Sequence, residues 1–206
     1  MKKLSTSKQM AINMVAAIVS FLIGTGINFV LAPYLVKELG SETYGFIGLA
    51  NNFVQYATIV TSALNSMSGR FISIEYSKGN IDKASRYFSS VLVADLIIAG
   101  VLLLVSSIIT FNIEFILNVP ENLVDSVKIL FAFTFATFII SVITAIFTTA
   151  AFVKNKLYIN SLRDIASNTL KLLLIVILFS FFPAKVYFLA MASLASGIFL
   201  FLTNIK

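Results

Sequence analysis

The stretch APYLVKELGSETYG, residues 32–45, decides the fold, because it places a short polar segment between two long apolar runs. The flanking residues 9–36 and 43–69 contain no charged residue. Each run is longer than the roughly 20 residues with which a helix crosses about 30 Å of hydrocarbon. The pattern predicts a helical hairpin in a membrane. Pro33 is expected to end or kink the first helix, and Gly40 to form the turn.

The same pattern extends over all 206 residues, of which 59% are hydrophobic and only 12% charged. A soluble domain would carry roughly a quarter charged residues. The chain is therefore predicted to be an all-α, polytopic membrane helix bundle forming a single unit over residues 1–206. Six transmembrane helices are expected at residues 10–35, 44–69, 87–110, 127–153, 162–182 and 186–205.

The distribution of cations predicts the orientation of the bundle. Eleven of the fifteen Lys and Arg residues lie at the two termini or in the second and fourth loops, and cytoplasmic loops are the ones enriched in these residues. They are Lys2, Lys3, Lys8, Arg70, Lys78, Lys83, Arg86, Lys154, Lys156, Arg163 and Lys206. Both termini should therefore face the cytoplasm. The apolar run after Lys8 is too long for a signal peptide, so we expect a retained first helix.

The second loop is expected to extend the second helix beyond the membrane. It should turn at Gly79 and Asn80 and restart with Asp82 as the N-cap. Its cations could touch anionic headgroups or could simply face solvent.

Missing residue types exclude several functions. The chain has no cysteine and no histidine, so it lacks disulfides, thiolate metal ligands and nucleophile–histidine catalysis. Glycine-rich phosphate loops are absent, and the net charge of +6 is not gathered on a soluble face. We predict no enzymatic activity, no metal, no cofactor and no nucleic-acid partner.

Polar residues fall on stripes within the expected helices. The second helix carries Asn51, Gln55, Thr58, Ser62, Asn65, Ser66 and Gly69 within an arc of about 100°. The first, fourth and fifth helices have comparable stripes: Asn13 to Asn28, Thr134 to Thr148, and Asn160 with Asp164, Ser167, Asn168 and Lys171. Such stripes indicate either close interhelical packing or the wall of a watery cavity. The hydroxyl groups of the fourth helix favour packing, whereas the carboxamides of the second helix leave the two interpretations evenly balanced, because each needs several hydrogen bonds.

Two ionisable residues lie deeper in the expected spans. Asp95 and Lys171 each sit about 12–14 Å from the cytoplasmic side, which permits an ion pair between them. Charges inside a membrane are costly and indicate function by default. One interpretation is a structural ion pair. In the other, Lys171 and Arg70 present positive charge to an anionic substrate, and Asp95 holds Lys171 when the site is empty.

The segment FVLAPYLVKELGSETYGFIGLANNFVQY resembles the first hairpin of bacterial polysaccharide exporters of the Wzx type. Its Pro33 turn is followed by Leu39-Gly40 and Tyr44-Gly45, and SGRFISIEYSKGNIDKASRYFSS is similar to the next connection of that family. These flippases belong to the multidrug/oligosaccharidyl-lipid/polysaccharide exporter superfamily. The resemblance covers one six-helix, amino-terminal lobe of a two-lobe exporter.

The resemblance implies a flippase in the bacterial plasma membrane that moves undecaprenyl-pyrophosphate-linked oligosaccharide for O-antigen, capsule or a related polymer. Its partners would be that lipid-linked substrate, membrane lipids and a second six-helix lobe. By analogy with a central cationic cavity, we expect the following residues to line a substrate cavity: Arg70, Lys171, Asp95, Asn51, Gln55, Asn65, Asn28 and Asp164.

Three alternatives remain open. A multidrug or toxic-compound antiporter of the same superfamily would need acidic cavity residues without compensating bases. A membrane scaffold subunit would satisfy its polar stripes through interhelical bonds and have no cavity. An enzyme of lipid-linked sugar synthesis is the weakest alternative, since such enzymes usually show cytoplasmic carboxylate motifs.

Overall fold

The computed structural model describes residues 6–205, apart from the side chains of residues 6, 60, 63, 64, 67 and 68, and consists of helices joined by turns and short loops. The predicted all-α class is confirmed. Lys2, Lys3 and Lys206, which contribute to the predicted orientation, lie outside the described residues. The helices are α1 (Thr6–Leu39), α2 (Ser41–Ser77), α3 (Ile81–Phe111), α4 (Ile113–Ile116), the 3₁₀ helix η1 (Glu121–Leu123), α5 (Val124–Val153), α6 (Leu157–Phe181) and α7 (Tyr187–Ile205).

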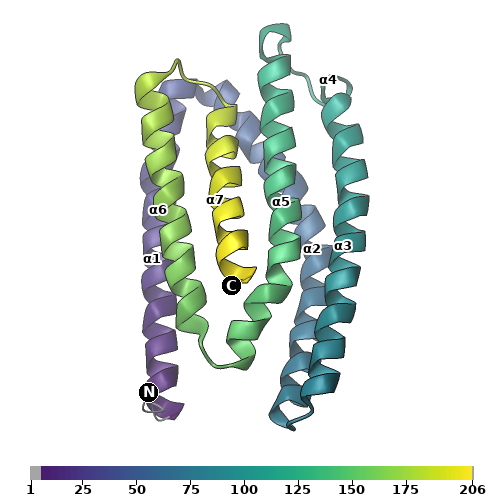
Figure 1. Cartoon of the computed structure of the whole chain (residues 1–206). Coiled ribbons are helices and arrows are strands. Elements are labelled where there is room, and N and C mark those ends of the chain that lie inside the picture. The colour runs from purple at the N-terminus through teal and green to yellow at the C-terminus, as the bar shows by residue number, and fades with distance from the viewer. Residues whose placement is uncertain (1–5, 206) are drawn as a thin grey trace.

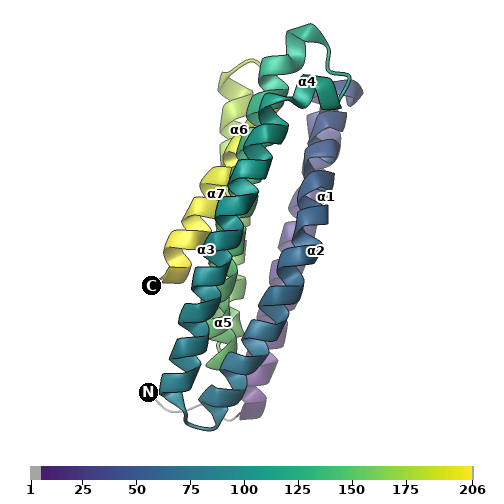
Figure 2. The same cartoon turned by 90° about the vertical axis from the view of Figure 1, so that its right-hand side faces the viewer.

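The six long helices form an upright bundle (Figures 1 and 2). The start of α1, the α2–α3 turn and the α5–α6 turn lie at one end, which we call the basic end because Lys78, Lys83, Lys154 and Lys156 lie there. The other connections lie at the opposite end, the hairpin end. On one side α1 packs on α6, and on the other α2 packs on α3 and α5, with α7 packed between α5 and α6.

Five of the six long helices are apolar enough, among the described residues, to cross a membrane: α1, α3, α5, α6 and α7. Helix α2 is the longest at 37 residues but is not among them. Its stripe of Asn, Gln, Ser and Thr residues lowers its hydropathy. The sixth crossing therefore stays a prediction, and it rests on the length of α2 and on its place inside the bundle.

A dense apolar core closes the hairpin end. Phe131 is fully buried in α5, and the ring of Phe53 meets it edge-on with the centroids 5.8 Å apart. Phe46 and Ala50 of α2 and Val186 before α7 complete the same cluster. Toward the basic end, α1 and α2 diverge (Figure 1), and α2 and α6 do not pack on each other over the described residues. The space between the two sides therefore widens away from the hairpin end.

The first hairpin turns where it is predicted to turn, although α1 does not end at Pro33. The helix continues through this proline to Leu39, four residues beyond the expected end at Leu35. Gly40 then takes φ +80°, a conformation that L side chains rarely adopt, and α2 begins at the next residue. Glycine is therefore what allows so short a connection.

The α2–α3 turn confirms Gly79, at φ +81°, but not the predicted N-cap. Helix α3 begins at Ile81, so Asn80 occupies the N-cap position and Asp82 lies in the first turn. Asn80 Nδ2 donates to Glu75 Oε2 at 2.9 Å instead of capping the helix. The prediction of Asp82 as N-cap is wrong because the chain already reverses at Gly79. A carboxylate in the first turn still favours the helix N-terminus.

The α5–α6 connection is tighter than predicted, and α6 begins at Leu157, five residues before the expected start. Asn155 adopts φ 54° and closes the turn. The buried side chain of Asn13 on α1 holds it: Nδ2 donates to Asn155 O at 3.1 Å and to Asn155 Oδ1 at 2.9 Å. Asn13 Oδ1 accepts from the Tyr158 N–H at 3.0 Å. This contact, which we call the Asn13 knot, fixes α1 to the start of α6.

Candidate substrate cavity

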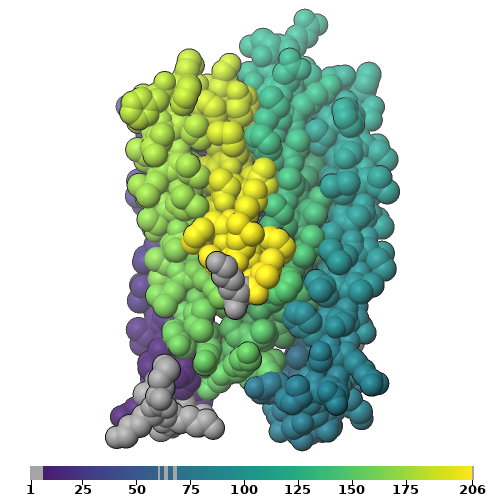
Figure 3. Space-filling model, viewed as in Figure 1, coloured from purple at the N-terminus to yellow at the C-terminus, as the bar shows by residue number. Residues whose placement is uncertain are grey.

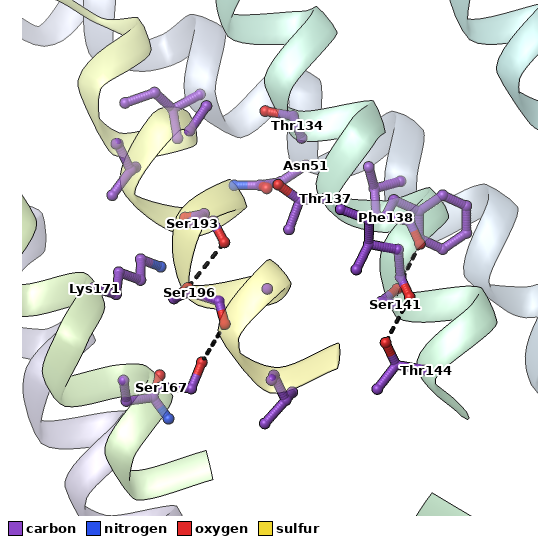
Figure 4. Close-up of a pocket in the computed structure, with 18 of the residues that line it drawn as sticks. Asn51, Thr134, Thr137, Phe138, Ser141, Thr144, Ser167, Lys171, Ser193 and Ser196 are labelled. Carbon is purple, nitrogen blue, oxygen red and sulfur yellow. Dashed lines mark hydrogen bonds between the residues drawn. The ribbon is translucent and has the colours of Figure 1, made fainter. Parts of the chain in front are cut away.

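A cavity of about 440 Å³ lies between α2, α5, α6 and α7. We call it the Lys171 cavity, after its one charged residue among the described lining (Figure 4). Its wall draws on four of the long helices, so the polar stripes of separate helices meet here. The polar lining consists of Asn51, Thr58, Thr134, Thr137, Ser141, Thr144, Ser167, Asn168, Lys171, Ser193 and Ser196.

The α5 stripe lines this cavity while its hydroxyl donors bond within their own helix. Thr137 donates to Phe133 O at 2.8 Å, and Thr144 donates to Ile140 O at 2.7 Å. Such bonds leave the hydroxyl oxygens as acceptors toward the cavity. The stripe also serves packing at one point, because a Cβ on Gly197 of α7 would lie 3.5 Å from the Thr137 methyl group. This stripe therefore both lines a cavity and packs on α7, which are the two roles that its spacing predicts.

Lys171 places the charge of the cavity near the middle of α6. It lies 14 residues after the start of α6 and 10 before its end, about 21 and 15 Å along the axis. Figure 4 shows its side chain reaching toward Ser193 and Ser196 of α7. Neither Lys171 nor the adjacent Asn168 makes a side-chain hydrogen bond or salt bridge with another described residue. The ammonium group thus has no protein counterion within the described part of the chain.

Asp95 is not that counterion, so the predicted Asp95–Lys171 ion pair is wrong. Helix α3 packs on α2 and α5 but not on α6 in the described structure. Asp95 is 2% exposed and does not line the Lys171 cavity. Its Oδ2 has no hydrogen-bond partner among the described groups. Equal depth along two helices did not make them neighbours.

Arg70 and Asn65 line a second pocket of about 620 Å³ between α2, α5 and α6, the Arg70 pocket. It lies nearer the basic end, since Arg70 follows Thr58 by 12 residues, about 18 Å along α2. Asn160 lines the same pocket and donates from Nδ2 to Thr148 O at 3.2 Å, while its buried Oδ1 has no described partner. Arg70 and Lys171 therefore line two separate pockets and do not form one site.

The other expected cavity residues lie elsewhere. Asp164 lines a third pocket, of about 760 Å³, between α1 and α6 beside the Asn13 knot. Gln55 of α2 and Asn28 of α1 are exposed and line none of the pockets described here. Of the eight expected residues, Asn51 and Lys171 share the main cavity.

The stripe on α1 serves packing. Asn13 forms the knot described above, and Gly24 allows close approach to α6, where a Cβ would lie 3.4 Å from Asn168 Nδ2. Small residues let membrane helices approach in this way. For this helix the interhelical interpretation holds from Asn13 to Gly24.

The polar face of α7 is the feature that the sequence analysis missed. Ser193, Ser196 and Gly197 follow one another at helical spacing on the cavity side. Ser167 Oγ donates to Ser196 O at 3.1 Å, and Arg163 Nη1 donates to Asn204 Oδ1 at 2.9 Å, so polar bonds tie α6 to α7. The spacing i, i+3, i+4 of Ser193, Ser196 and Gly197 is the sequence pattern that could have revealed this face. Figure 3 shows α7 filling the upper part of the face between α5 and α6, with the two sides of the bundle parted below it.

These features define a polytopic helical membrane protein with a polar, cationic cavity between its helices. Residues 10–206 match the family described as "Polysaccharide biosynthesis protein", and the chain belongs to that family. It is 32% identical over 187 residues to a Bacillus subtilis (strain 168) protein described as "Uncharacterized membrane protein EpsK". That match covers 91% of this chain and 37% of the relative, so the chain spans well under half the length of the relative. No solved structure matches it significantly. The resemblance drawn from the first hairpin is thus confirmed at the level of the family.

Proposed function

We propose that this chain is one lobe of a flippase that carries undecaprenyl-pyrophosphate-linked oligosaccharide across the bacterial plasma membrane. The observation that carries the proposal is Lys171, an ammonium group without a described counterion in a polar cavity about halfway along the apolar helix α6. A charge there is costly unless a ligand or water uses it. The family to which the chain belongs supports a role in polysaccharide biosynthesis.

The chemistry of the cavity favours an anionic, hydroxyl-rich ligand. Lys171 supplies a point charge for phosphate oxygens. The carboxamides of Asn51 and Asn168 offer donors and acceptors to sugar hydroxyls, and the serine and threonine oxygens offer further acceptors. The Arg70 pocket would receive the same headgroup nearer the cytoplasm. We therefore assign Arg70 and Lys171 to successive positions along one path.

The orientation follows from the basic end. Cytoplasmic ends of membrane helices are rich in Lys and Arg, so this state would open to the cytoplasm, with both termini on that side. The hairpin end, closed by the Phe131 core, would face outward.

A second lobe completes the proposal. Asn28 and Gln55 are exposed within long helices, and carboxamides facing hydrocarbon lack partners. We place the second lobe, supplied by the rest of a longer protein or by another chain, against these faces of α1 and α2. Rocking of the two lobes would then open the path alternately to the cytoplasm and to the outside.

The drug-exporter alternative fits the cavity less well. A site for organic cations needs an acidic group, and the described lining of the Lys171 cavity contains Lys171 and no carboxylate. A non-transporting scaffold remains the competing interpretation, and the following experiment separates it from transport.

The test compares cells that lack the gene, cells with the wild-type gene and cells with Lys171→Ala. Deletion of the gene should abolish surface polymer and leave lipid-linked oligosaccharide in the inner leaflet. Lys171→Ala should lower surface polymer at least about tenfold at unchanged protein level, while Lys83→Ala, an exposed lysine of the basic end, should not. A tenfold loss corresponds to about 1.4 kcal/mol. Normal polymer in Lys171→Ala cells would remove Lys171 from the path, and normal polymer without the gene would refute the function.

A further inference from the structure

A separate crevice of about 240 Å³ lies between α2, α3 and α5, on the side away from α6 and α7. Phe53 and Tyr56 of α2 and Phe135 of α5 line it, and Val105 of α3 forms part of its rim, being 48% exposed. Its described lining contains no charged side chain, and the hydroxyl of Ser106 donates to Leu103 O at 3.1 Å. The crevice therefore offers apolar contact and no charge to a ligand.

The crevice and the Lys171 cavity share a wall. Val54 of α2 and Phe138 of α5 line both spaces. Next to them, Thr58 and Ser141 line the polar side, and Ser141 Oγ donates to Phe138 O at 2.7 Å. Val54 and Phe138 thus form the boundary between a polar cationic chamber and an apolar crevice at a similar depth, and a ligand that occupies both spaces has to pass between these two side chains.

We infer that this crevice binds the first isoprene units of a polyprenyl chain whose anionic head occupies the Lys171 cavity. This inference rests on the proposed function for the identity of the head. The juxtaposition suits an amphiphile, because an ion and a hydrocarbon chain need opposite surroundings within a few bonds of each other. Aromatic and β-branched side chains supply van der Waals contact, which drives association where lipid is as apolar as protein.

A phospholipid acyl chain is the competing occupant. Its head lies at the membrane surface and does not bind Lys171. Its tail would therefore occupy the crevice no more often than it contacts any other lipid-exposed surface of the protein. A polyprenyl pyrophosphate is held at its head, so its first units are kept beside Val54 and Phe138. The two occupants therefore differ in whether labelling is confined to the crevice.

The experiment uses two photoactivatable probes in native membranes that contain the whole gene product. One is a polyprenyl pyrophosphate and the other the uncharged polyprenol, each with a diazirine in its second isoprene unit. The pyrophosphate should label the peptides that hold Phe53 to Ala57 and Leu102 to Ile109, and the polyprenol, which lacks the head that Lys171 holds, should label the same peptides about tenfold more weakly. Lys171→Ala should lower labelling by the pyrophosphate about tenfold and leave labelling by the polyprenol unchanged.

Filling the crevice tests the site itself. Ala57 lines the crevice but not the Lys171 cavity, so Ala57→Trp should lower labelling by both probes about tenfold. Val105→Trp should do the same from the rim. The matched control is Ala94→Trp on an exposed part of α3 that lines none of the pockets described here, and it should change nothing.

Three results would overturn the inference. Labelling spread evenly over exposed residues such as Phe29 and Leu104 would show bulk lipid. Unchanged labelling in a stably inserted Ala57→Trp or Val105→Trp protein would place the tail elsewhere. If neither variant inserts, competition decides on wild-type protein: excess phosphatidylglycerol that removes the label as well as polyprenol does would assign the crevice to phospholipid. Labelling by polyprenol does not depend on export. The crevice can therefore prove not to bind the tail although Lys171→Ala cells lose surface polymer, and it can bind the tail although those cells keep normal polymer.

Discussion

Replacement of Lys171 by methionine should stabilise the lobe while it abolishes transport. Methionine keeps the length of the side chain and removes the charge. Because no described residue pairs with the ammonium group, the substitution strands no counterion. A lysine at the centre of a membrane helix costs about 2.5–3.5 kcal/mol. The polar lining of the cavity offsets part of this cost, so we expect a gain of about 1–3 kcal/mol.

The assay is thermal unfolding of the purified protein in detergent, beside the polymer measurement in cells. For a chain of this size, 1 kcal/mol corresponds to about 2–4 °C. Lys171→Arg keeps the charge and should give no gain, and Lys83→Met, at an exposed position, should stay within about 0.5 kcal/mol of wild type.

The sign of the change decides between two interpretations. Removal of one member of a buried ion pair destabilises a protein by about 3–5 kcal/mol. A loss of that size in Lys171→Met would show that the ammonium group holds the bundle together. It would refute the reasoning that leads from an unpaired charge to a ligand site.

Three further predictions follow from polar groups outside the cavity. Asn13→Ala should lower unfolding stability by about 1–3 kcal/mol, since it breaks the bonds of the Asn13 knot. Asn13→Asp keeps the acceptor for Tyr158 but turns a carboxylate oxygen toward Asn155 O and Oδ1, so it should lose at least as much, and a smaller loss would contradict the assigned geometry. Asp95→Asn should raise the melting temperature, because it removes an ionisable oxygen that is buried without a described partner; a lower melting temperature would reveal a missing contact. Hydrogen bonds from Asn80 and then Lys78 lower the pKa of Glu75 below its ordinary value of 4.5, so the α2–α3 turn should keep this contribution above pH 4.5 and lose it as the pH falls through the lowered pKa. Hydrogen exchange at the turn should show this loss in wild type, and a Glu75→Gln protein with the same pH dependence would contradict it.

The stripes on the helices show how far periodicity carries an argument. Polar residues at helical spacing predicted that certain faces of the second, fourth and fifth helices avoid lipid, and Asn51, Ser141 and Lys171 do meet around one cavity. The same rule applied to the first helix gave a face that packs on α6, where Asn13 and Gly24 make close contacts. Periodicity identifies a face that needs a partner, but it does not say whether the partner is water or another helix.

The eight expected site residues separate for the same reason. Position along a helix fixes depth, because each residue advances about 1.5 Å, and depth correctly puts Lys171 near the middle of its span. Depth says nothing about the angle between helices. Asp95 shares that depth and faces other helices, while Arg70 lies about 18 Å farther along α2 in its own pocket.

By itself the sequence determined the helices, their connections and the family, because charge-free runs, Gly40 and Gly79 act locally through hydrocarbon length and backbone freedom. Only the tertiary structure decided which helices are neighbours. Lateral order in a membrane bundle depends on side-chain packing between distant segments, such as Ser167 on Ser196 and Asn13 on Asn155. That order brings Lys171 to the α2–α5–α7 wall and leaves Asp95 outside it, so it decides which charge a substrate would meet.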